Sequence, residues 1–375
     1  MPGFELIDKK EFIAVKKIFD DGGILFAHGF DNIRKNYHVR EFEKNFKKYI
    51  GAKYCLAVSS GTAAIKIGLK SLGVKRGDEV ITQSFNFIAT VEAIIDLGAT
   101  PVIVNIDRSL NIDIKDLKKK ITKKTKVVIP VHMLGYPCDM KQLKIICNKK
   151  KIKILEDNCE SLGGFYKKTL LGNCSDIGVI SFDFGKTITT GEGGMIITNN
   201  KKIYDFCRQY HDHGHMNLKN VSRGNDAVNF PGFNYRMTEL QGAFGKTQLS
   251  KIKSLLKDNK KKYLILKKNI KKFEKRKLVA EGTPNFDTFI FFVENPIKKR
   301  KILEVLKRNN FGTKNLPDAI KWHCASYWKH IFNNKEIKRI NYSLKLLKKA
   351  IALPIFFKKT TSFYKKLAKE INEVS

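Results

Sequence analysis

The sequence lacks the long apolar runs and the paired cysteines that mark two large classes of protein. No apolar stretch approaches the roughly 20 residues that a membrane-spanning helix needs. The first residues, Met1-Pro-Gly-Phe-Glu, do not have the basic-then-apolar layout of a secretion signal. The 7 cysteines are odd in number and have no metal-type spacing. These absences predict a soluble cytoplasmic protein with reduced thiols.

Acidic residues are scarce relative to basic ones. The chain has 36 Asp and Glu against 72 Lys and Arg, which gives a net charge of +36. A basic surface attracts phosphate backbones, so this charge alone suggests a nucleic-acid-binding protein. The lysines, however, recur from Lys9 to Lys369 without a nucleic-acid-binding motif. We therefore expect solvated lysine faces with a mild attraction for anionic substrates, and neither a nucleic acid nor a membrane as partner.

The hydrophobic pattern predicts two domains. Short apolar runs alternate with helical stretches at 54–58, 79–82, 101–106, 127–131, 153–155, 179–182 and 195–198. That rhythm is typical of an α/β domain with a largely parallel sheet. After residue 232 comes a long lysine-rich helix to about 272, then a strand at 288–293 and helices at 298–309, 339–350 and 362–371. We expect a large domain at 1–250, which begins with a helical segment, and a small C-terminal domain at 251–375.

Lys186 has the most informative setting of any residue in the chain. It lies in Ser181-Phe-Asp-Phe-Gly-Lys186-Thr, between an apolar run and a glycine-rich segment that ends at Gly194. A primary amine in such a place can form a Schiff base with a carbonyl compound or with pyridoxal phosphate. Most lysines are surface residues, so this interpretation needs support from other segments.

Three further segments supply that support, although each has a simpler interpretation. Ser60-Gly61-Thr62 follows a strand and opens a helix, so it is either an anion site or an ordinary helix cap. Phe87 follows the next strand and either stacks on a flat ring or belongs to the core. Asp157 ends a buried strand, where it pairs with a protonated pyridine nitrogen or with a structural cation.

Together these segments resemble the pyridoxal phosphate-dependent sugar aminotransferases of the DegT/DnrJ/EryC1/StrS family. The resemblance covers most of the chain, and its strongest motifs are Ser60–Thr62, Gly77–Ile81, Glu156–Asp157, Ser181–Gly194 and Gly232–Thr238. It implies the α/β architecture of fold type I. In that fold a mixed, mostly parallel seven-stranded sheet forms the large domain, and a smaller α+β domain lies at the C-terminus.

The resemblance also implies a role for each matching residue. Lys186 would hold the cofactor as a Schiff base and then move protons, and Asp157 would pair with the ring nitrogen. Phe87 would stack on the ring. The phosphate would be held by Gly61, Thr62 and Ser181 and, from the neighbouring subunit, by Asn234. The active site would therefore be shared within a homodimer.

The substrate side is predicted from two loops. His211-Asp-His213-Gly-His215 looks like a metal cluster, but no further ligand lies at metal-site spacing, so we expect no metal. Relatives have a His-Gly pair near the substrate entrance, which implies that His213 lies at the pocket rim. Likewise, His323 would face the substrate. Arg223 either grips a carboxylate or phosphate or is an exposed loop residue.

Glu160 departs from the family pattern, which often has Gln or His beside the cofactor's 3-hydroxyl. A carboxylate next to a phenolate is repulsive unless a proton is shared, so the role of Glu160 is open. Glutamate at this position also resembles related dehydratases. Those enzymes carry His in place of the Schiff-base lysine, however, so Lys186 favours transamination.

The resemblance implies transfer of an amino group from L-glutamate to a keto or aldehydo sugar for lipopolysaccharide or other surface glycans. The segments 181–186, 211–215 and 312–323 look most like aminotransferases that make 8-amino-3,8-dideoxy-manno-octulosonate. The alternative acceptor is a nucleotide-linked 4-keto-6-deoxyhexose. An alternative of another class is a non-transaminating dehydratase or a regulator that binds pyridoxal phosphate.

Overall fold

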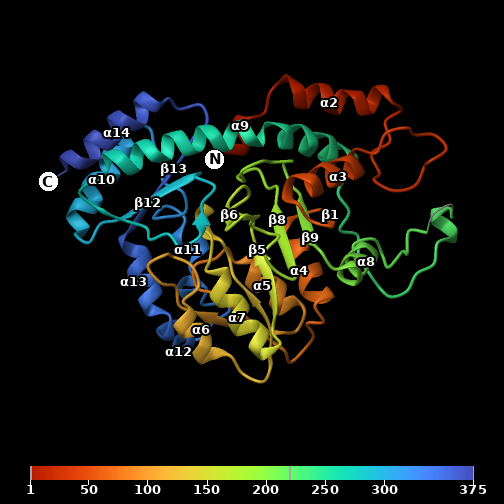
Figure 1. Ribbon diagram of the computed structural model, residues 1–375, viewed down its shortest axis with the longest axis horizontal. Helices are drawn as coiled ribbons and strands as arrows, with labels where there is room; N and C mark the ends of the chain where they lie inside the picture. Colours follow the sequence, from red (N-terminus) through yellow and green to blue (C-terminus); the bar gives the residue numbers. More distant parts are fainter. Residues whose placement is uncertain (1, 219–220, 375) are drawn as a thin grey trace.

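The structure, a computed structural model, describes residues 2–218 and 221–374. A seven-stranded sheet forms the centre of the large domain, in the order β1-β9-β8-β5-β4-β2-β3 (Figure 1). Its strands are β1 (Tyr54–Val58), β2 (Glu79–Gln83), β3 (Thr100–Val104), β4 (Thr125–Ile129), β5 (Lys153–Asp157), β8 (Ile177–Ser181) and β9 (Gly194–Thr198). Only β9 runs against its neighbours β1 and β8. The predicted mixed, mostly parallel sheet of seven strands is therefore confirmed.

Helices cover the sheet on both faces, which explains why its strands read as continuous apolar runs. Successive side chains of β4 point to opposite faces. Val127 and Ile129 join a core with α4 (Gly61–Ser71), whereas Val128 joins another with α7 (Met140–Lys150). The other helices of this domain are α5 (Ala89–Asp96), α6 (Ile114–Lys120) and α8 (Lys201–Tyr210), with 3-10 turns η1 (Met133–Gly135) and η2 (Arg223–Asn225). The short strands β6 (Phe165–Tyr166), β7 (Thr169–Leu170) and β11 (Gly282–Thr283) form a separate small sheet.

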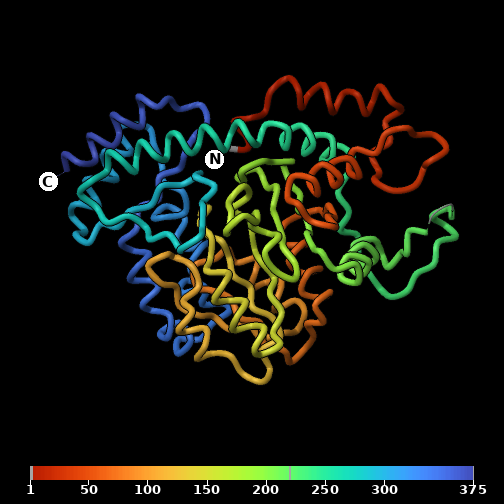
Figure 2. The backbone as a smooth tube through the Cα atoms, viewed as in Figure 1, coloured from red at the N-terminus to blue at the C-terminus, as the bar shows by residue number. Residues whose placement is uncertain are grey.

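The long helix α9 (Glu239–Asn269) runs along the top of the molecule from the large domain to the C-terminal part (Figure 2). A capping box between Thr238 and Gln241 begins it. The predicted domain boundary at residue 250 falls inside this helix and stays a prediction. None of the helices in the described ranges is both long enough and apolar enough to cross a membrane.

The C-terminal part is a small antiparallel sheet with helices against it. Its strands are β10 (Glu274–Lys275), β12 (Thr288–Phe292) and β13 (Ala350–Pro354). The helices are α10 (Pro296–Arg308), α11 (Ile320–His323), α12 (Asn334–Arg339), α13 (Asn341–Lys349) and α14 (Thr361–Glu373), with the 3-10 turn η3 (Ala325–Tyr327). Sequence periodicity did not reveal β13. It follows α13 without a break, and its five residues are too few to show their own period.

The N-terminal helices attach to several parts of the molecule. In α1 (Pro2–Glu5), the Gly3 N–H donates to the Lys186 carbonyl at 3.0 Å. The Phe4 ring stacks on Phe184 with centroids 5.2 Å apart, and the Glu5 carboxylate accepts a 2.6 Å hydrogen bond from the Phe357 N–H. The next two helices, α2 (Lys9–Asp20) and α3 (His38–Ile50), pack against α9. Segment α1 thus ties the Lys186 loop to the C-terminal part.

Candidate active site

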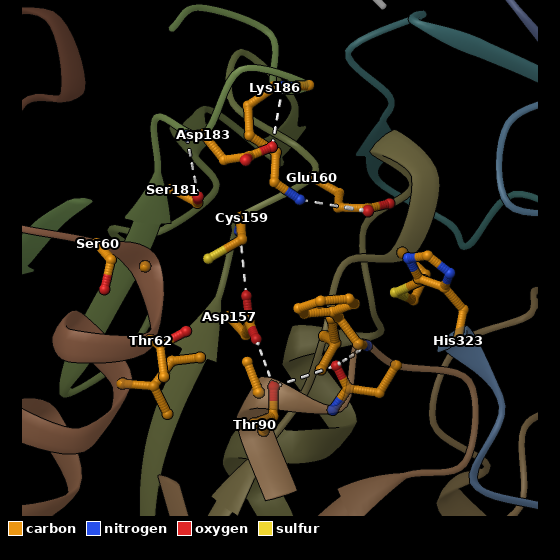
Figure 3. Close-up of a pocket in the computed structure, with 18 of the residues that line it drawn as sticks. Ser60, Thr62, Thr90, Asp157, Cys159, Glu160, Ser181, Asp183, Lys186 and His323 are labelled. Carbon is orange, nitrogen blue, oxygen red and sulfur yellow. Dashed lines mark hydrogen bonds and ion pairs between the residues drawn. The ribbon is translucent and has the colours of Figure 1, made fainter. Parts of the chain in front are cut away.

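A cavity of about 470 Å³ lies where β1, β5 and β8 end (Figure 3). The carboxyl ends of parallel strands meet at one edge of a sheet, which is where open α/β folds keep their sites. Most residues predicted from the sequence line this cavity, namely Gly61, Thr62, Phe87, Asp157, Glu160, Ser181, Lys186 and His323. In Figure 3, Lys186 and Glu160 form one wall, Asp157 and Thr90 lie below them, and Ser60 and Thr62 face His323 across the cavity. The roles of these residues remain predictions.

The start of α4 forms a cradle suited to an anion. Ser60 Oγ accepts a hydrogen bond from the Ala63 N–H at 3.0 Å and so caps the helix. The N–H groups of Gly61 and Thr62 belong to the first turn and have no intrahelical acceptor. A Cβ atom at Gly61 would lie 2.7 Å from Ser181 Cβ, so only glycine allows α4 to approach the end of β8 this closely. Free N–H groups beside two hydroxyl side chains are a fitting site for phosphate.

Asp157 is buried, with 3% of its surface exposed. Its carboxylate accepts hydrogen bonds from Thr90 Oγ1 at 3.0 Å and from the Cys159 N–H at 3.1 Å. Both donors are neutral, and no cationic side chain of the described residues forms an ion pair with Asp157. A buried carboxylate without a cationic partner fits a protonated pyridine nitrogen better than a structural salt bridge.

Lys186 and Glu160 form an ion pair inside the cavity, with Nζ 3.5 Å from Oε1. Burial disfavours the ammonium form, but the Glu160 carboxylate more than offsets this, so the pKa of Lys186 is raised. Burial alone would also raise the pKa of Glu160, yet the charges of Lys186 and Lys314 lower it to about 2. Glu160 therefore stays ionised as the partner of the Lys186 amine, which gives this departure from the family pattern a physical role.

Phe87 and His323 form the wall opposite the α4 cradle, with ring centroids 5.4 Å apart. Phe87 is 42% exposed, so it is not a core residue and its ring is free to stack on a ligand. Backbone hydrogen bonds fix the pair, because the Asn86 N–H donates to the His323 carbonyl at 3.0 Å. Burial lowers the pKa of His323, and its Nδ1 lies 2.9 Å from the Ala319 carbonyl. In the neutral ring, Nδ1–H therefore donates to this carbonyl and Nε2 is left as an acceptor.

Sequence reasoning missed several polar residues that line the cavity, among them Thr90, Lys314 and Asn315. Thr90 lies on α5, three residues after Phe87, so its closeness to that predicted ring contact was a signal that could have found it. Lys314 pairs with Asp287 at 3.0 Å, and Asn315 donates to Glu160 at 3.4 Å. The segment 312–323 that holds these two residues was part of the family resemblance, but nothing in the sequence singled out Lys314 or Asn315 within it. Lys314 is one of 72 basic residues, and only the folded chain brings residues 312–323 to the strand ends.

Three predicted site residues do not line the cavity. Arg223 binds the buried Asp212 through both of its Nη atoms, with Nη1 at 2.6 Å from Oδ2, so this guanidinium is already engaged. His213 is exposed in a turn with φ of 54°. Asn234 is exposed and forms a bridge with Asp212. Both residues belong to the arm, residues 211–218 and 221–238, which projects from the large domain between α8 and α9 (Figure 1). The role of Asn234 in a neighbouring subunit stays a prediction.

The three imidazoles of the 211–215 segment have different surroundings. His211 is buried against Arg208, with Nδ1 2.6 Å from its carbonyl, and burial lowers the pKa of His211 to about 4. His215 Nδ1 lies 3.4 Å from Asp226, while His213 is exposed. Across residues 2–218 and 221–374, no group of three or more His, Cys, Asp or Glu side chains is arranged to hold a metal ion.

The fold and the cavity are those of a pyridoxal phosphate-type aminotransferase. Residues 28–372 match the family model described as "DegT/DnrJ/EryC1/StrS aminotransferase family", and the chain belongs to that family. It is 37% identical to GDP-perosamine synthase of Escherichia coli O157:H7 over 237 residues, 63% of this chain and 64% of that protein. It is 30% identical to the spore coat polysaccharide biosynthesis protein SpsC of Bacillus subtilis over 364 residues, 94% of this chain and 90% of that protein.

The match with the perosamine synthases is partial. It spans 64% of the E. coli protein and 59% of the Vibrio cholerae protein, which is less than two thirds of either. Among solved structures, an aminotransferase from Psychrobacter cryohalolentis aligns with a TM-score of 0.87 over 98% of this chain and 97% of that one. The two sequences are 24% identical, so this likeness shows the fold alone.

The family depends on pyridoxal phosphate, so the predicted cofactor and enzyme class are confirmed at the level of the family. One solved neighbour, the E. coli GDP-4-keto-6-deoxy-D-mannose-3-dehydratase, contains hydrated pyridoxal phosphate. The residues of the present cavity fit this group. The α4 cradle suits its phosphate, the Asp157 carboxylate, which has no cationic partner among the described residues, suits its ring nitrogen, and the partly buried Lys186 amine suits its aldehyde.

Proposed function

We propose that this chain is an aminotransferase that moves an amino group from L-glutamate to a keto sugar with pyridoxal phosphate as cofactor. The single observation that carries this proposal is the placement of Lys186 and Asp157. A partly buried amine and a buried carboxylate without a cationic partner among the described residues line one cavity beside a phosphate-type cradle. Bound pyridoxal phosphate would supply an electron sink for a carbanion at the substrate carbon.

The chain's own residues divide the work between holding the cofactor and moving protons. Lys186 Nζ would carry a proton to and from the substrate carbon, and Glu160 would balance its charge when the amine is free. Asp157 would hold its negative charge against the ring nitrogen, with Thr90 fixing its orientation. Phe87 would cover one face of the ring and exclude water from it.

For the acceptor we propose a nucleotide-linked 4-keto-6-deoxyhexose. Relatives from three organisms, 36–38% identical to this chain, are named GDP-perosamine synthase. The octulosonate acceptor lacks such support, and Arg223, the residue considered for gripping a carboxylate or phosphate, is engaged by Asp212. The product would enter lipopolysaccharide or another surface glycan.

The acceptor test uses purified holoenzyme, GDP-4-keto-6-deoxy-D-mannose and ¹⁵N-glutamate. We expect ¹⁵N in the sugar product by mass spectrometry, and none with Lys186→Ala. Loss of a sugar hydroxyl without nitrogen incorporation would instead establish the dehydratase alternative. Turnover of glutamate without this acceptor being consumed would contradict the sugar that we propose.

We also propose a homodimer in which Asn234 completes the phosphate site of the neighbouring subunit. Its exposure on a projecting arm, outside its own cavity, supports this arrangement. A cofactor that binds the dimer favours the dimer by mass action. Adding pyridoxal phosphate to dilute apo-protein should therefore shift the mass found by light scattering towards the dimer. Mixed Lys186→Ala and Asn234→Ala subunits should recover activity, and a fully active monomer would contradict the shared site.

A further inference from the structure

Lys314 is a buried cation in the cavity wall for which the proposed chemistry has no use. It lies on the loop between α10 and α11 in the C-terminal part, and its side chain is 7% exposed. Its Nζ atom lies 3.0 Å from Asp287 Oδ2. The other oxygen of that carboxylate accepts from Thr288 Oγ1 at 2.7 Å. Thr288 therefore fixes the Asp287 carboxylate, and the carboxylate in turn fixes the Lys314 ammonium.

The Lys314 ammonium has hydrogen-bonding capacity to spare. An ammonium carries three N–H donors. Within the described residues, Asp287 is the only side chain or carbonyl that accepts from Nζ. Leaving buried N–H donors without acceptors is unfavourable, and the cost is larger for a charged group. Because Lys314 lines the cavity, an anionic ligand there would supply the missing acceptors.

The charges around the cavity single out Lys314 in a second way. Four carboxylates line it, those of Asp157, Glu160, Asp183 and Glu192. The cationic side chains of the lining are Lys186, Lys314 and His323, and burial lowers the pKa of His323. With Lys186 assigned to the cofactor, Lys314 is the remaining fixed cation among the lining residues. Lys314 is therefore the side chain of this cavity that can offset the negative charge of an entering dicarboxylate.

We propose that Lys314 binds a carboxylate of the amino donor, and that Asp287 positions it to do so. This inference rests on the proposed function, because a glutamate-dependent aminotransferase must admit a dicarboxylate next to Lys186. The carboxylate that binds Lys314 is either the α-carboxylate or the side-chain carboxylate of glutamate. Alanine has only the first, so a comparison of the two amino acids as donors separates them.

The primary experiment measures binding without turnover. Holoenzyme is titrated calorimetrically with glutarate, a dicarboxylate that has no amino group. Losing a charge-assisted hydrogen bond should weaken glutarate binding about 10- to 100-fold in Lys314→Met. Lys314→Arg should retain most of the affinity. Wild-type protein that does not bind glutarate, or equal affinity in wild type and Lys314→Met, would overturn the proposal.

Two variants separate ligand binding from folding. Lys314→Met leaves Asp287 buried without its partner, so D287N/K314M removes both charges and should restore thermal stability but not glutarate affinity. Lys262→Met is the matched control, because Lys262 is also buried and pairs with a carboxylate, that of Asp258, but does not line the cavity. It should lower stability and leave glutarate binding unchanged. Weaker glutarate binding in Lys262→Met would show that the effect is structural.

Kinetics assign the carboxylate and test the proposed function separately. In the donor half-reaction, Lys314→Met should raise the KM for glutamate about 10- to 100-fold. An unchanged KM for alanine would identify the side-chain carboxylate, and a parallel rise would identify the α-carboxylate. A rise confined to the sugar acceptor would overturn the proposal. If no nitrogen reaches any sugar while glutarate binding still depends on Lys314, the proposed function fails and the subsite stands.

Discussion

The two walls of the cavity differ in how the chain builds them. The cofactor wall consists of residues at the ends of strands or in the turns directly after them, such as Gly61, Asp157 and Ser181. The substrate wall, which we propose faces the substrate, carries Lys314 and Asn315 from a loop and His323 from α11, both in the C-terminal part. Local sequence therefore specifies the first wall, whereas the second exists only once two distant segments have packed together.

The largest expected effect tests the cofactor wall at Lys186. Lys186→Ala removes the group that moves the proton, so turnover should fall by at least about 10³-fold. The α4 cradle and Asp157 remain, so the variant should still bind pyridoxal phosphate in equilibrium dialysis. Borohydride reduction of the wild type followed by mass spectrometry should place the cofactor on Lys186. An adduct on another lysine would refute the assignment.

The next effect concerns the charge on this wall. Asp157→Asn keeps the shape but loses the negative charge, so turnover should fall roughly 10²- to 10³-fold while cofactor affinity changes little. Steady-state kinetics and dialysis together measure the two quantities. Near-normal turnover in Asp157→Asn would mean that this carboxylate only supports the structure.

A smaller effect comes from the residue that orients this charge. Thr90→Val removes the hydroxyl that donates to Asp157 at 3.0 Å, and turnover should fall about tenfold. Thr90→Ser keeps the hydroxyl and should retain most of the activity. If Thr90→Ser loses as much turnover as Thr90→Val, packing and not the hydrogen bond explains the effect.

The smallest effect lies where the two walls meet, at Glu160. Its pKa of about 2 is below the ordinary 4.5, so its ionised form stabilises the fold above pH 4.5 and this stability is lost as the pH falls towards 2. Glu160→Gln should unfold more easily at pH 7 by roughly 1–2 kcal/mol and lose less stability between pH 4.5 and 2. Urea unfolding across this range measures both quantities. If wild type and Glu160→Gln lose the same stability between pH 4.5 and 2, the charges of Lys186 and Lys314 do not stabilise the Glu160 carboxylate.

These predictions also mark what the sequence could and could not foretell. The sheet was predictable because strands buried on both faces read as apolar runs, and Asp157 was predictable because it ends such a run. Arg223 illustrates the opposite case. Its sequence setting allowed a ligand contact, but in the folded chain its guanidinium forms an ion pair with the buried Asp212. Lys314 could not be separated from the other lysines, because its burial follows from packing between segments and not from its neighbours in the chain.

The attachment of α1 has a practical consequence for protein engineering. The Gly3 amide is one hydrogen bond away from the peptide carbonyl of Lys186, and a Cβ atom at Gly3 would lie 2.5 Å from that oxygen. Substitution of Gly3 by any larger residue would therefore press on the loop that carries Lys186. The helix α14, at the other end of the described chain, contributes no residue to the lining of the cavity, so substitutions on α14 should leave the Lys186 loop undisturbed.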